Sequence, residues 1–593
     1  MQALPPGANF AANMPMSAEY EQPVQSKVEL AAALKTDPRN PYVGVLYRLA
    51  GLKRVAQLQE EAPRAFIAHL LQLLGVQAEW VHADGSVPAE GGVIVVANHP
   101  FGVVDQLVVL GQILAHRTDA KLLLPADQRT FDPLDPLVLR EEAAALHHLQ
   151  AGGCLIVFPA GQVSRLSRDL KTVTDGRWSP QVASFQAESK AAVLPVYLDG
   201  YSVDLMKLFE AVHPGLRRLP VIHKPMRSRQ LRKGPRTLRI RMGKPIAVRD
   251  VAHFHDPEQI TRFYRAKTYA LASSVRVPRA WFERTRSRGL QVAPLVDALP
   301  AEDLARELDA LPASALLFEQ SGFRCYLAPY DQIPLMMQEI GRSREETFRA
   351  VGEGTNHDSD LDEFDLHYHH LFLWDDKGQA LAGAYRIGFG AQIMDTFGKR
   401  GFYTSTLFRF SRAFRPVLEQ SIELGRSFVP VPYQKHRMPL FLLWKGVLSQ
   451  LVAHDTCRYV LGPVTISNRY NPLSKLLMMH YIHRNAPADV LADAVKPRKP
   501  YRPKVVNGRK QDLEALLSAV GRDIRGLDRV VADIEPDGAV VPVLLKRYLA
   551  QNARILAFNH DPKFNDALDG FMILDLNDLP AETVANLQRE FAQ

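Results

Sequence analysis

The sequence predicts an α/β protein of two domains, and three observations support this. The 593 residues exceed the roughly 250–300 residues at which a single hydrophobic core stops growing. Strand-like apolar runs alternate with helix-like segments in the first half of the chain, and a second alternation begins near Tyr326. Such alternation is typical of helices packed on a sheet, and in the first half it predicts largely parallel strands.

The composition indicates a globular protein in a reducing compartment. Apolar residues make up 47% and charged residues 23% of the chain, which excludes a mostly disordered or fibrous protein. The cysteines (Cys154, Cys325 and Cys457) are far apart and lack paired metal-ligand spacing. Residues 1–20 carry no secretory pattern, and no apolar run is long enough to span a bilayer. We expect a cytoplasmic protein, peripheral on the inner face of the cell membrane.

The net charge of +8 is local in origin. Residues 217–244 hold eleven Arg and Lys, residues 496–510 hold seven, and neither segment contains an acid. Without these eighteen, the chain has 54 basic residues against 64 acidic ones. Local basic segments indicate an anionic partner, such as lipid headgroups, an acidic carrier protein or nucleic acid, although many charge runs are only solvated faces. Few aromatics interleave with these runs, which disfavours nucleic acid.

The first half begins with a Pro- and Ala-rich arm, and helical spacing follows over residues 40–76. Strands are predicted at 93–97, 155–158, 193–198 and 238–242. The last of these alternates apolar residues with Arg239 and Arg241, which either solvate an edge strand or bind an anion. In the second half, helices are predicted at 338–351, 417–424 and 540–549, and strands at 371–374, 381–387, 458–461, 554–558 and 571–574. Residues 496–510 are predicted to be an exposed loop.

Polar side chains follow the predicted strand at 93–97. Asn98 and His99 come directly after it, and Asp105 stands at the start of a predicted helix. Reactive groups gather at the carboxyl ends of strands in open α/β sheets. An imidazole next to a carboxylate can act as a general base, because the acid fixes its tautomer and stabilises the imidazolium. The next strands end in FPAGQVSR (158–165) and PVYLDG (195–200), which place further polar turns at the same edge.

Taken singly, each of these turns has an ordinary structural explanation, but together they resemble the lysophospholipid acyltransferase family over residues 70–250. That family reads NHxxxxD, then FPEGxRS, then an apolar strand with Pro. The resemblance implies that His99 deprotonates the acceptor hydroxyl, which attacks an acyl thioester, and that Asp105 orients His99. It also implies a set of substrate-binding residues: Asn98, Phe101, Gly102, Phe158, Pro159, Gly161, Gln162, Ser164 and Arg165.

Two departures from the family pattern bear on the acceptor. The His-to-Asp spacing is one residue longer, and Ala160 replaces the acid of FPEG. Both departures resemble a hemolysin-like branch written NHPFGxxD and FPAGxxS, which is linked to lipids that contain amino acids. A weaker phosphate site suits an acceptor without phosphate, although Arg129 or Arg165 could still bind one.

The second half holds its own set of charged motifs, with acids at Asp360, Asp362 and Asp365. These carboxylates lack the central Gly of a calcium loop, so we expect no metal. Glu423 and Arg426 are three residues apart on a predicted helix, where an i,i+3 ion pair is the simplest interpretation.

Together the motifs of residues 326–470 resemble the acyl-homoserine-lactone synthase branch of GNAT-like N-acyltransferases, and more closely ornithine N-acyltransferases. The resemblance implies that Asp360, or a water it holds, is the base. It further implies site roles for Arg344, Phe348, Asp362, Asp365, Arg386, Glu423 and Arg426. No coenzyme A pyrophosphate loop is visible, which favours an acyl carrier protein as donor, with acyl-CoA as the alternative and no tightly bound cofactor.

The composition and helical patterning predict an arm with amphipathic helices (1–70) and a helical linker (251–315). The resemblances predict a glycerolipid-acyltransferase-like αβ domain (71–250) and a GNAT-like α+β domain (316–593). We expect a bifunctional acyltransferase that N-acylates an ornithine-like amino acid and then O-acylates the lyso-lipid hydroxyl. Its expected partners are acyl carrier protein, a membrane lipid surface and a small amino acid. The alternatives are a lysophospholipid acyltransferase with a structural C-terminal domain, and a non-enzymatic protein that binds anionic surfaces.

Overall fold

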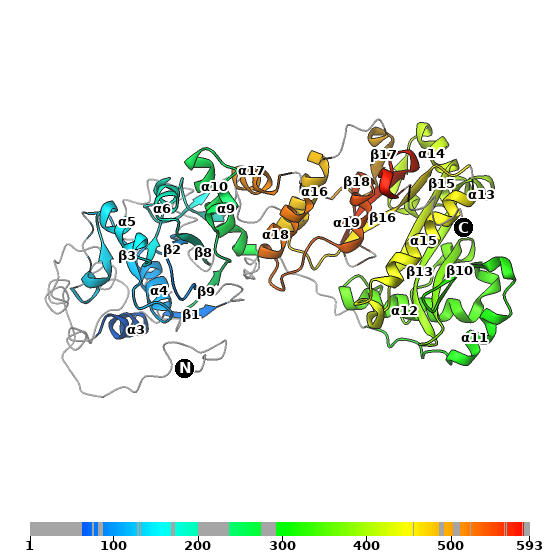
Figure 1. Cartoon of the computed structure of the whole chain (residues 1–593), viewed down its shortest axis with the longest axis horizontal. Coiled ribbons are helices and arrows are strands. Elements are labelled where there is room, and N and C mark those ends of the chain that lie inside the picture. Colours follow the sequence, from blue (N-terminus) through cyan, green and yellow to red (C-terminus); the bar gives the residue numbers. More distant parts are fainter. Residues whose placement is uncertain are drawn as a thin grey trace, which may run out of the picture. The chain divides into compact units, whose positions relative to one another are not determined.

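The computed structural model describes residues 62–73, 76–80, 87–126, 128, 130, 132–167, 172–199, 236–273, 292–454, 456–485, 491–501, 510–521, 523–562, 564, 566–583 and 585. The chain forms two compact units. Unit 1 contains residues 1–282 and 504–540, and unit 2 contains residues 283–503 and 541–593 (Figure 1). The predicted arm and most of the first basic run lie outside the described residues.

Unit 1 is built on a sheet with the strand order β1-β9-β8-β2-β5-β3-β4. The strands are β1 (Val76–Trp80), β2 (Val93–Ala97), β3 (Lys121–Leu123), β4 (Val138–Leu139), β5 (Cys154–Val157), β8 (Ala192–Leu198) and β9 (Arg236–Met242). Neighbouring strands are parallel except β8 and β9. The predicted, largely parallel α/β layer is thus confirmed.

Helices cover this sheet, and a small hairpin stands beside it. The helices are α3 (Pro63–Leu73), α4 (Val103–Ile113), α5 (Glu142–Gln150), α6 (Gln181–Ser189), α9 (Val248–Val251), α10 (Pro257–Ala270), α17 (Lys510–Val520) and α18 (Ile524–Ile534). The hairpin joins β6 (Arg165–Ser167) to β7 (Thr172–Thr174). Strand β2 is buried along its whole length between β5 and β8, which explains its uninterrupted apolar sequence. Its Val93, Val95 and Ala97 share one core with α3 and α4.

Unit 2 is built on a mixed sheet with the order β10-β11-β12-β13-β15-β16-β19-β18. The strands are β10 (Leu316–Gln320), β11 (Phe323–Pro329), β12 (His369–Asp375), β13 (Ala380–Phe389), β15 (Ser421–Phe428), β16 (Tyr459–Ile466), β18 (Arg554–Asp561) and β19 (Ala567–Asp575), with a separate pair β14 (Phe408–Phe410) and β17 (Val495–Pro497). Among the described strand pairs of unit 2, only β15 and β16 run parallel, over Ser421–Glu423 and Tyr459–Leu461.

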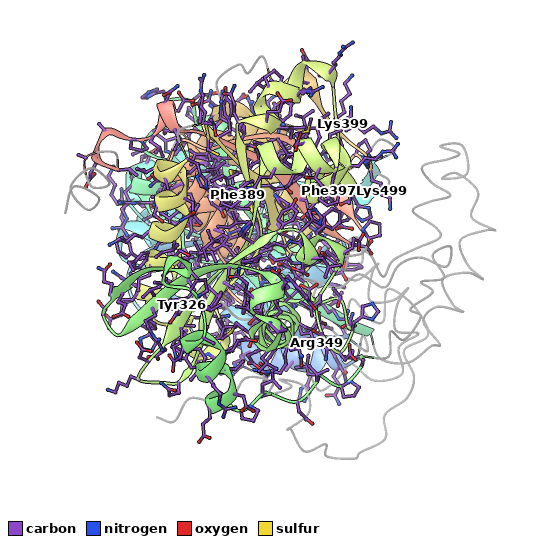
Figure 2. The ribbon with its side chains drawn as sticks, turned by 90° about the vertical axis from the view of Figure 1, so that its right-hand side faces the viewer. Tyr326, Arg349, Phe389, Phe397, Lys399 and Lys499 are labelled. Carbon is purple, nitrogen blue, oxygen red and sulfur yellow. The ribbon has the colours of Figure 1, made fainter. Side chains whose placement is uncertain are left out.

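The helices of unit 2 are α11 (Ala301–Asp309), α12 (Pro334–Val351), α13 (Gly390–Thr396), α14 (Arg415–Glu419), α15 (Met438–Ala453), α16 (Pro472–Asn485) and α19 (Val543–Ala550). Figure 2 views this unit, with Tyr326 of β11 and Arg349 of α12 labelled. Tyr326 stacks on Phe372 of β12 with ring centroids 5.4 Å apart. In the part of the chain that the structure describes, no helix is both long and apolar enough to cross a membrane.

Four sequence-based expectations differ from the structure. The predicted helix at 417–424 is wrong, because α14 ends at Glu419 and residues 421–428 pair as a strand with β13 and β16. Strand β9 is no edge strand, because β1 and β8 flank it. The predicted loop at 496–510 begins as strand β17. The described residues 510–521 and 523–540, expected in the second domain, belong to unit 1.

Candidate active sites

Asn98 fixes the loop that follows β2. Its side-chain amide donates to the carbonyl of Leu198 at 2.9 Å and accepts from the Leu198 N–H at 2.7 Å. The side chain thereby continues the ladder between β2 and β8 by one step, as a backbone amide would. The sequence predicted a substrate-binding role for Asn98, and the structure gives it a structural contact that aims the next residue, His99.

His99 and Asp105 form a close pair at the carboxyl end of β2. His99 Nδ1 lies 3.1 Å from Asp105 Oδ2, and the Asp105 side chain is fully buried. The same carboxylate oxygen accepts the N–H groups of Phe101 at 2.7 Å and Gly102 at 3.0 Å. Burial raises the pKa of Asp105, and His99 and these two N–H groups partly oppose the rise. A proton held on Nδ1 leaves Nε2 to act as a base toward a hydroxyl.

The additional residue between His99 and Asp105 lengthens the turn whose backbone N–H groups bind the Asp105 carboxylate. The turn through Phe101 and Gly102 folds back over the start of α4, so that both N–H groups reach the carboxylate. Gly102 has a φ of +81°, a conformation that L side chains adopt only at a cost. The longer spacing is therefore part of how this chain holds Asp105.

The FPAG turn packs against the histidine. The ring of Phe158 lies 4.6 Å from the ring of His99, centroid to centroid. Ser164 is buried, and its N–H donates to the carbonyl of His99 at 2.8 Å. The Pro159 carbonyl accepts from the backbone N–H of Ser179 at 2.9 Å. Gly161 (φ +61°) and Gln162 form an exposed turn. The side chains of Arg165 and Arg129 lie outside the described residues, so their predicted phosphate contact stays a prediction.

Asp175 is a site residue that the sequence analysis missed. Its Oδ1 accepts the backbone N–H of His99 at 3.2 Å and also the hydroxyl of Ser164. Its Oδ2 accepts from Trp178 Nε1 at 2.8 Å, and its own N–H donates to the Tyr269 hydroxyl at 2.7 Å. Asp175 thus joins the histidine turn to the FPAGQVS turn. In the sequence, Asp175 begins an Asp-Gly turn near a Trp. This turn does not follow any of the four predicted strands, so the sequence did not mark Asp175 as a site residue.

In unit 2, three arginines and three aspartates form one largely buried cluster, of which Asp362 and Arg426 are partly exposed. The members come from α12 (Arg344), the turn before β12 (Asp360, Asp362 and Asp365), β13 (Arg386) and β15 (Arg426). Arg344 Nη1 donates to the carbonyl of Asp360 at 3.0 Å and lies 3.2 Å from Asp365 Oδ1. Arg386 Nη1 lies 3.3 Å from the same oxygen and also pairs with Asp362. Six of the predicted site residues are therefore brought together.

The charges in this cluster balance one another. Burial works against ionisation of Asp365, but Arg344 and Arg386 outweigh it and hold the pKa of Asp365 below its usual range. Burial lowers the pKa of the neighbouring His370 to about 4, and a ring nitrogen of His370 lies 3.0 Å from the Asp365 carbonyl. The cluster resembles other buried ion-pair networks, in which loss of one partner leaves a charge uncompensated.

Arg426 contacts both the acidic turn and two aromatic rings. Its Nε lies 3.1 Å from Asp360 Oδ2 and its Nη2 lies 3.0 Å from Asp362 Oδ2. Its guanidinium also lies 5.0 Å from the ring centre of Tyr403 and 4.7 Å from that of Phe564. Burial opposes the charge, yet Asp360, Tyr403 and Asp362 together raise the pKa of Arg426. Arg426 has a φ of +50°, which aims its side chain from a distorted point of β15.

Glu423 does not pair with Arg426, so the predicted i,i+3 pair is wrong. A strand places these residues differently from a helix, and the Glu423 carboxylate instead accepts the backbone N–H groups of Tyr403 and Thr404, both at 2.9 Å. It also accepts the hydroxyls of Tyr368 and Thr404. Glu423 therefore holds the segment that carries Tyr403. Phe348, also predicted for this site, meets Phe564 edge to face at 5.8 Å.

The sequence analysis also missed Asp569 on β19. The Thr465 hydroxyl donates to its Oδ1 at 2.7 Å, and burial is the largest cause that raises the pKa of Asp569 to about 7. Burial and the Asp569 charge likewise raise the pKa of Glu353 to about 7. Such a carboxyl group can exchange a proton near neutral pH. No alternation pattern marks Asp569, because it lies within a strand that is buried along its length.

Family comparisons show an acyltransferase with an N-terminal acyltransferase domain and a C-terminal GNAT-like domain, in agreement with the two folded units. Residues 52–277 match the family model described as acyltransferase. Residues 343–444 match the model described as acetyltransferase (GNAT) domain. The chain is therefore an enzyme, and the interpretation as a non-enzymatic anion-binding protein is not supported.

Particular relatives carry acyltransferase names. The glycine N(alpha)-acyltransferase of Phocaeicola vulgatus is 29% identical over 246 residues, which are 39% of this chain and 73% of that protein. The glycine N(alpha)-acyltransferase of Bacteroides thetaiotaomicron is 29% identical over 252 residues, 40% of this chain and 72% of that protein.

Two solved structures also align with parts of the chain. The 1-acyl-sn-glycerophosphate acyltransferase PlsC from Thermotoga maritima has 17% identity and a TM-score of 0.24, covering 40% of this chain and 91% of its own. The CoA-dependent acyl-homoserine lactone synthase MesI has 12% identity and a TM-score of 0.22, covering 46% of this chain and 96% of its own.

Proposed function

We propose that this enzyme is bifunctional and makes a diacylated aminolipid. Unit 2 N-acylates a small amino acid with a 3-hydroxy fatty acyl group, and unit 1 O-acylates the hydroxyl of that product. The observation that carries the proposal is the presence in one chain of the His99–Asp105 pair and of a GNAT-like domain. The first product contains the hydroxyl that the second reaction consumes, so the two activities form a sequence.

In the O-acyl step, His99 Nε2 takes the proton of the acceptor hydroxyl as its oxygen attacks the thioester carbonyl. The tetrahedral intermediate then expels the thiolate, which receives that proton from the imidazolium and leaves as the thiol. Asp105 holds Nδ1 and stabilises the imidazolium during both steps. Phe158 packs against the imidazole, with the two ring planes tilted by 43°.

In the N-acyl step, the ammonium of the amino acid must lose a proton before the amine attacks the carbonyl of the acyl donor. The tetrahedral intermediate then expels the donor's thiolate, which takes up the second nitrogen proton and leaves as the thiol. Asp360, or a water it holds, remains the proposed acceptor, although its carboxylate is paired with Arg426. Asp569 is a second candidate, because a carboxyl group with a pKa of about 7 binds a proton more tightly than an ordinary aspartate. Arg344 and Arg386 hold the acidic turn that carries Asp360.

The names of the sequence relatives favour glycine as the amino acid, whereas the motif resemblance favours ornithine. We propose acyl carrier protein as the donor, with acyl-CoA as the alternative. Residues of the basic runs other than the buried Arg241 would meet the acidic carrier protein and the anionic inner face of the membrane. Each nearby Lys or Arg contributes about 1 kcal/mol to binding such a surface.

Expression in a host without aminolipids tests the proposal. Lipid mass spectrometry after feeding of isotope-labelled glycine or ornithine, in parallel cultures, should reveal a new diacylated lipid that carries one of the two labels. The His99→Ala variant should accumulate the monoacyl lipid. Absence of any labelled N-acyl product would rule out the proposal, and activity on lysophosphatidic acid alone would favour a glycerolipid acyltransferase instead.

A further inference from the structure

Helices α17 and α18 follow most of unit 2 in the sequence, yet they pack in unit 1. Helix α17 lies along α10 and contacts α18. Their buried side chains are Asp512, Leu516, Val520, Leu527, Val530, Val531 and Ile534. We call residues 510–534 the returning helix pair. The single buried acid in this apolar face needs a partner opposite it. It therefore indicates that the two helices pack on unit 1 in one specific register.

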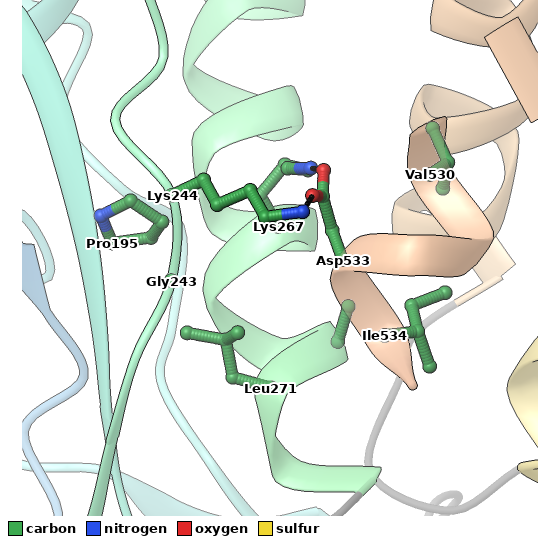
Figure 3. Close-up of a pocket in the computed structure, with 9 residues that line it drawn as sticks. Pro195, Gly243, Lys244, Lys267, Leu271, Val530, Asp533 and Ile534 are labelled. Carbon is green, nitrogen blue, oxygen red and sulfur yellow. Dashed lines mark hydrogen bonds and ion pairs between the residues drawn. The ribbon is translucent and has the colours of Figure 1, made fainter. Parts of the chain in front are cut away.

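The carboxyl end of α18 is anchored by basic side chains of unit 1. Arg241 Nη1 donates to the carbonyl of Ile534 at 2.9 Å, and its Nη2 donates to that of Asp533 at 3.2 Å. A guanidinium at this end of a helix satisfies unpaired carbonyls and complements the helix dipole. The Asp533 side chain pairs with Lys244 at 3.2 Å and with Lys267, and Figure 3 shows the three charges converging.

Asp512 of α17 makes a different contact, which leads to the catalytic turn. It pairs with Arg265 of α10, and both side chains are buried. The other terminal nitrogen of Arg265 donates to Thr174 Oγ1 at 2.7 Å and to the Asp175 carbonyl at 3.2 Å. Asp175 in turn accepts the backbone N–H of His99. A continuous path of polar contacts therefore runs from Asp512 to the turn that carries His99.

We propose that α17 positions the O-acyltransferase site through Asp512 and Arg265, which are positioning residues for that reaction. This inference rests on the proposed O-acyl transfer by unit 1. Without Asp512, the buried guanidinium of Arg265 lacks its anionic partner and moves toward the remaining acceptors at Thr174 and Asp175. That movement displaces the acceptor of the His99 N–H.

The test compares Asp512→Asn with a matched control, Asp533→Asn, in the full chain. Both variants remove one carboxylate from the returning helix pair, but only Asp512 is connected to Asp175. We expect Asp512→Asn to lower kcat for O-acylation by about tenfold to a hundredfold, with KM changed less than about threefold. Asp533→Asn should leave kcat within about twofold, and both variants should keep wild-type N-acylation.

A double-mutant cycle with Asp175→Asn distinguishes a positioning effect on the His99 turn from a general loosening of the returning helix pair. Because Asp512 acts through Asp175, the double variant Asp512→Asn/Asp175→Asn should be no slower than Asp175→Asn alone, whereas Asp533→Asn should show no such coupling. Unchanged O-acylation in Asp512→Asn, equal losses in both single variants, or an additive cycle would overturn the inference. A wild-type chain that N-acylates but never O-acylates would contradict the proposed function instead.

Discussion

The two candidate sites hold their buried carboxylates in opposite ways. In unit 1, Asp105 is bound by one imidazole and two backbone N–H groups, and burial raises its pKa. In unit 2, Asp365 is surrounded by guanidinium groups that hold its pKa low. In the proposed mechanism the first carboxylate supports a proton transfer by its neighbour, whereas the second mainly balances buried charge. Substitution should therefore reduce activity in unit 1 and stability in unit 2.

The largest expected effect is on the rate of O-acyl transfer. His99→Ala removes the proposed base and should lower this rate by about a hundredfold to ten-thousandfold, while N-acylation continues. Asp105→Asn should show a smaller loss of the same kind, because Asn cannot balance the imidazolium. Separate assays of the two reactions on the purified chain measure both effects. A His99→Ala enzyme that retains wild-type O-acylation would remove His99 from the mechanism.

Replacing a buried aspartate by Asn in unit 2 should mainly reduce stability, in contrast to the effect of Asp105→Asn on activity in unit 1. Asp365→Asn leaves Arg344 and Arg386 without a shared carboxylate, and both guanidinium groups are fully buried. We expect the free energy of unfolding of unit 2 to fall by about 3–5 kcal/mol. Hydrogen exchange of peptides from β13 and β15 reports this unit alone, and peptides from β2 serve as the internal control. Equal losses in both units would contradict the comparison.

Asp365 also gives unit 2 a predicted sensitivity to acid. Its folded-state pKa lies below the unfolded value of about 3.9. The stability that its ionisation contributes is therefore present above roughly pH 4 and is lost as the pH falls toward the folded pKa. Exchange protection of β13 in the wild type should decline in this range, and the difference between wild type and Asp365→Asn should narrow.

How much the sequence could predict differs between the two sites for a physical reason. The His99 and Asp105 pair is local, since a strand, a turn and the first turn of a helix bring it together within a few residues. The alternating units of strand and helix in unit 1 were predictable for the same reason. Asp175 was not predicted as a site residue, because its role depends on hydrogen bonds with Trp178 and Tyr269 that no short sequence motif indicates.

Unit 2 was harder to predict because its site depends on strand pairing between distant segments. Glu423 and Arg426 have helix-like spacing with their neighbours, but pairing with β13 and β16 overrides that preference. The positive φ of Arg426 then sends it to Asp360 and Asp362. The return of residues 510–534 to unit 1 was likewise invisible, because an amphipathic helix does not specify which surface it covers.

Asp569 and Asp365 belong to the same unit, but we expect their ionisation to change its stability with pH in opposite directions. Its pKa is raised from 3.8 to about 7, so the unfolded chain releases this proton first as the pH rises. Asp569 therefore lowers the stability of unit 2 between about pH 4 and pH 7, by about 1.4 kcal/mol per pH unit. Asp569→Asn cannot ionise, so its stability relative to the wild type should increase over this range. Urea unfolding followed by exchange of β19 peptides at several pH values measures the difference, and a constant difference would contradict the prediction.

The smallest expected effect tests whether backbone N–H groups really support the unit 1 site. Gly102 and Gly161 both have positive φ, at +81° and +61°. An added Cβ at Gly102 would lie 3.3 Å from Val163 Cγ2, whereas a Cβ at Gly161 would meet no atom within 4 Å. Gly102 combines its positive φ with a ψ of −125°, so alanine there should cost about 1–3 kcal/mol of stability, and alanine at Gly161 about 1–2 kcal/mol. Only Gly102→Ala should also slow O-acylation, because strain at Gly102 moves an N–H that binds Asp105. Equal O-acylation rates in the two variants would mean that Asp105 is held by His99 and Phe101 without help from Gly102.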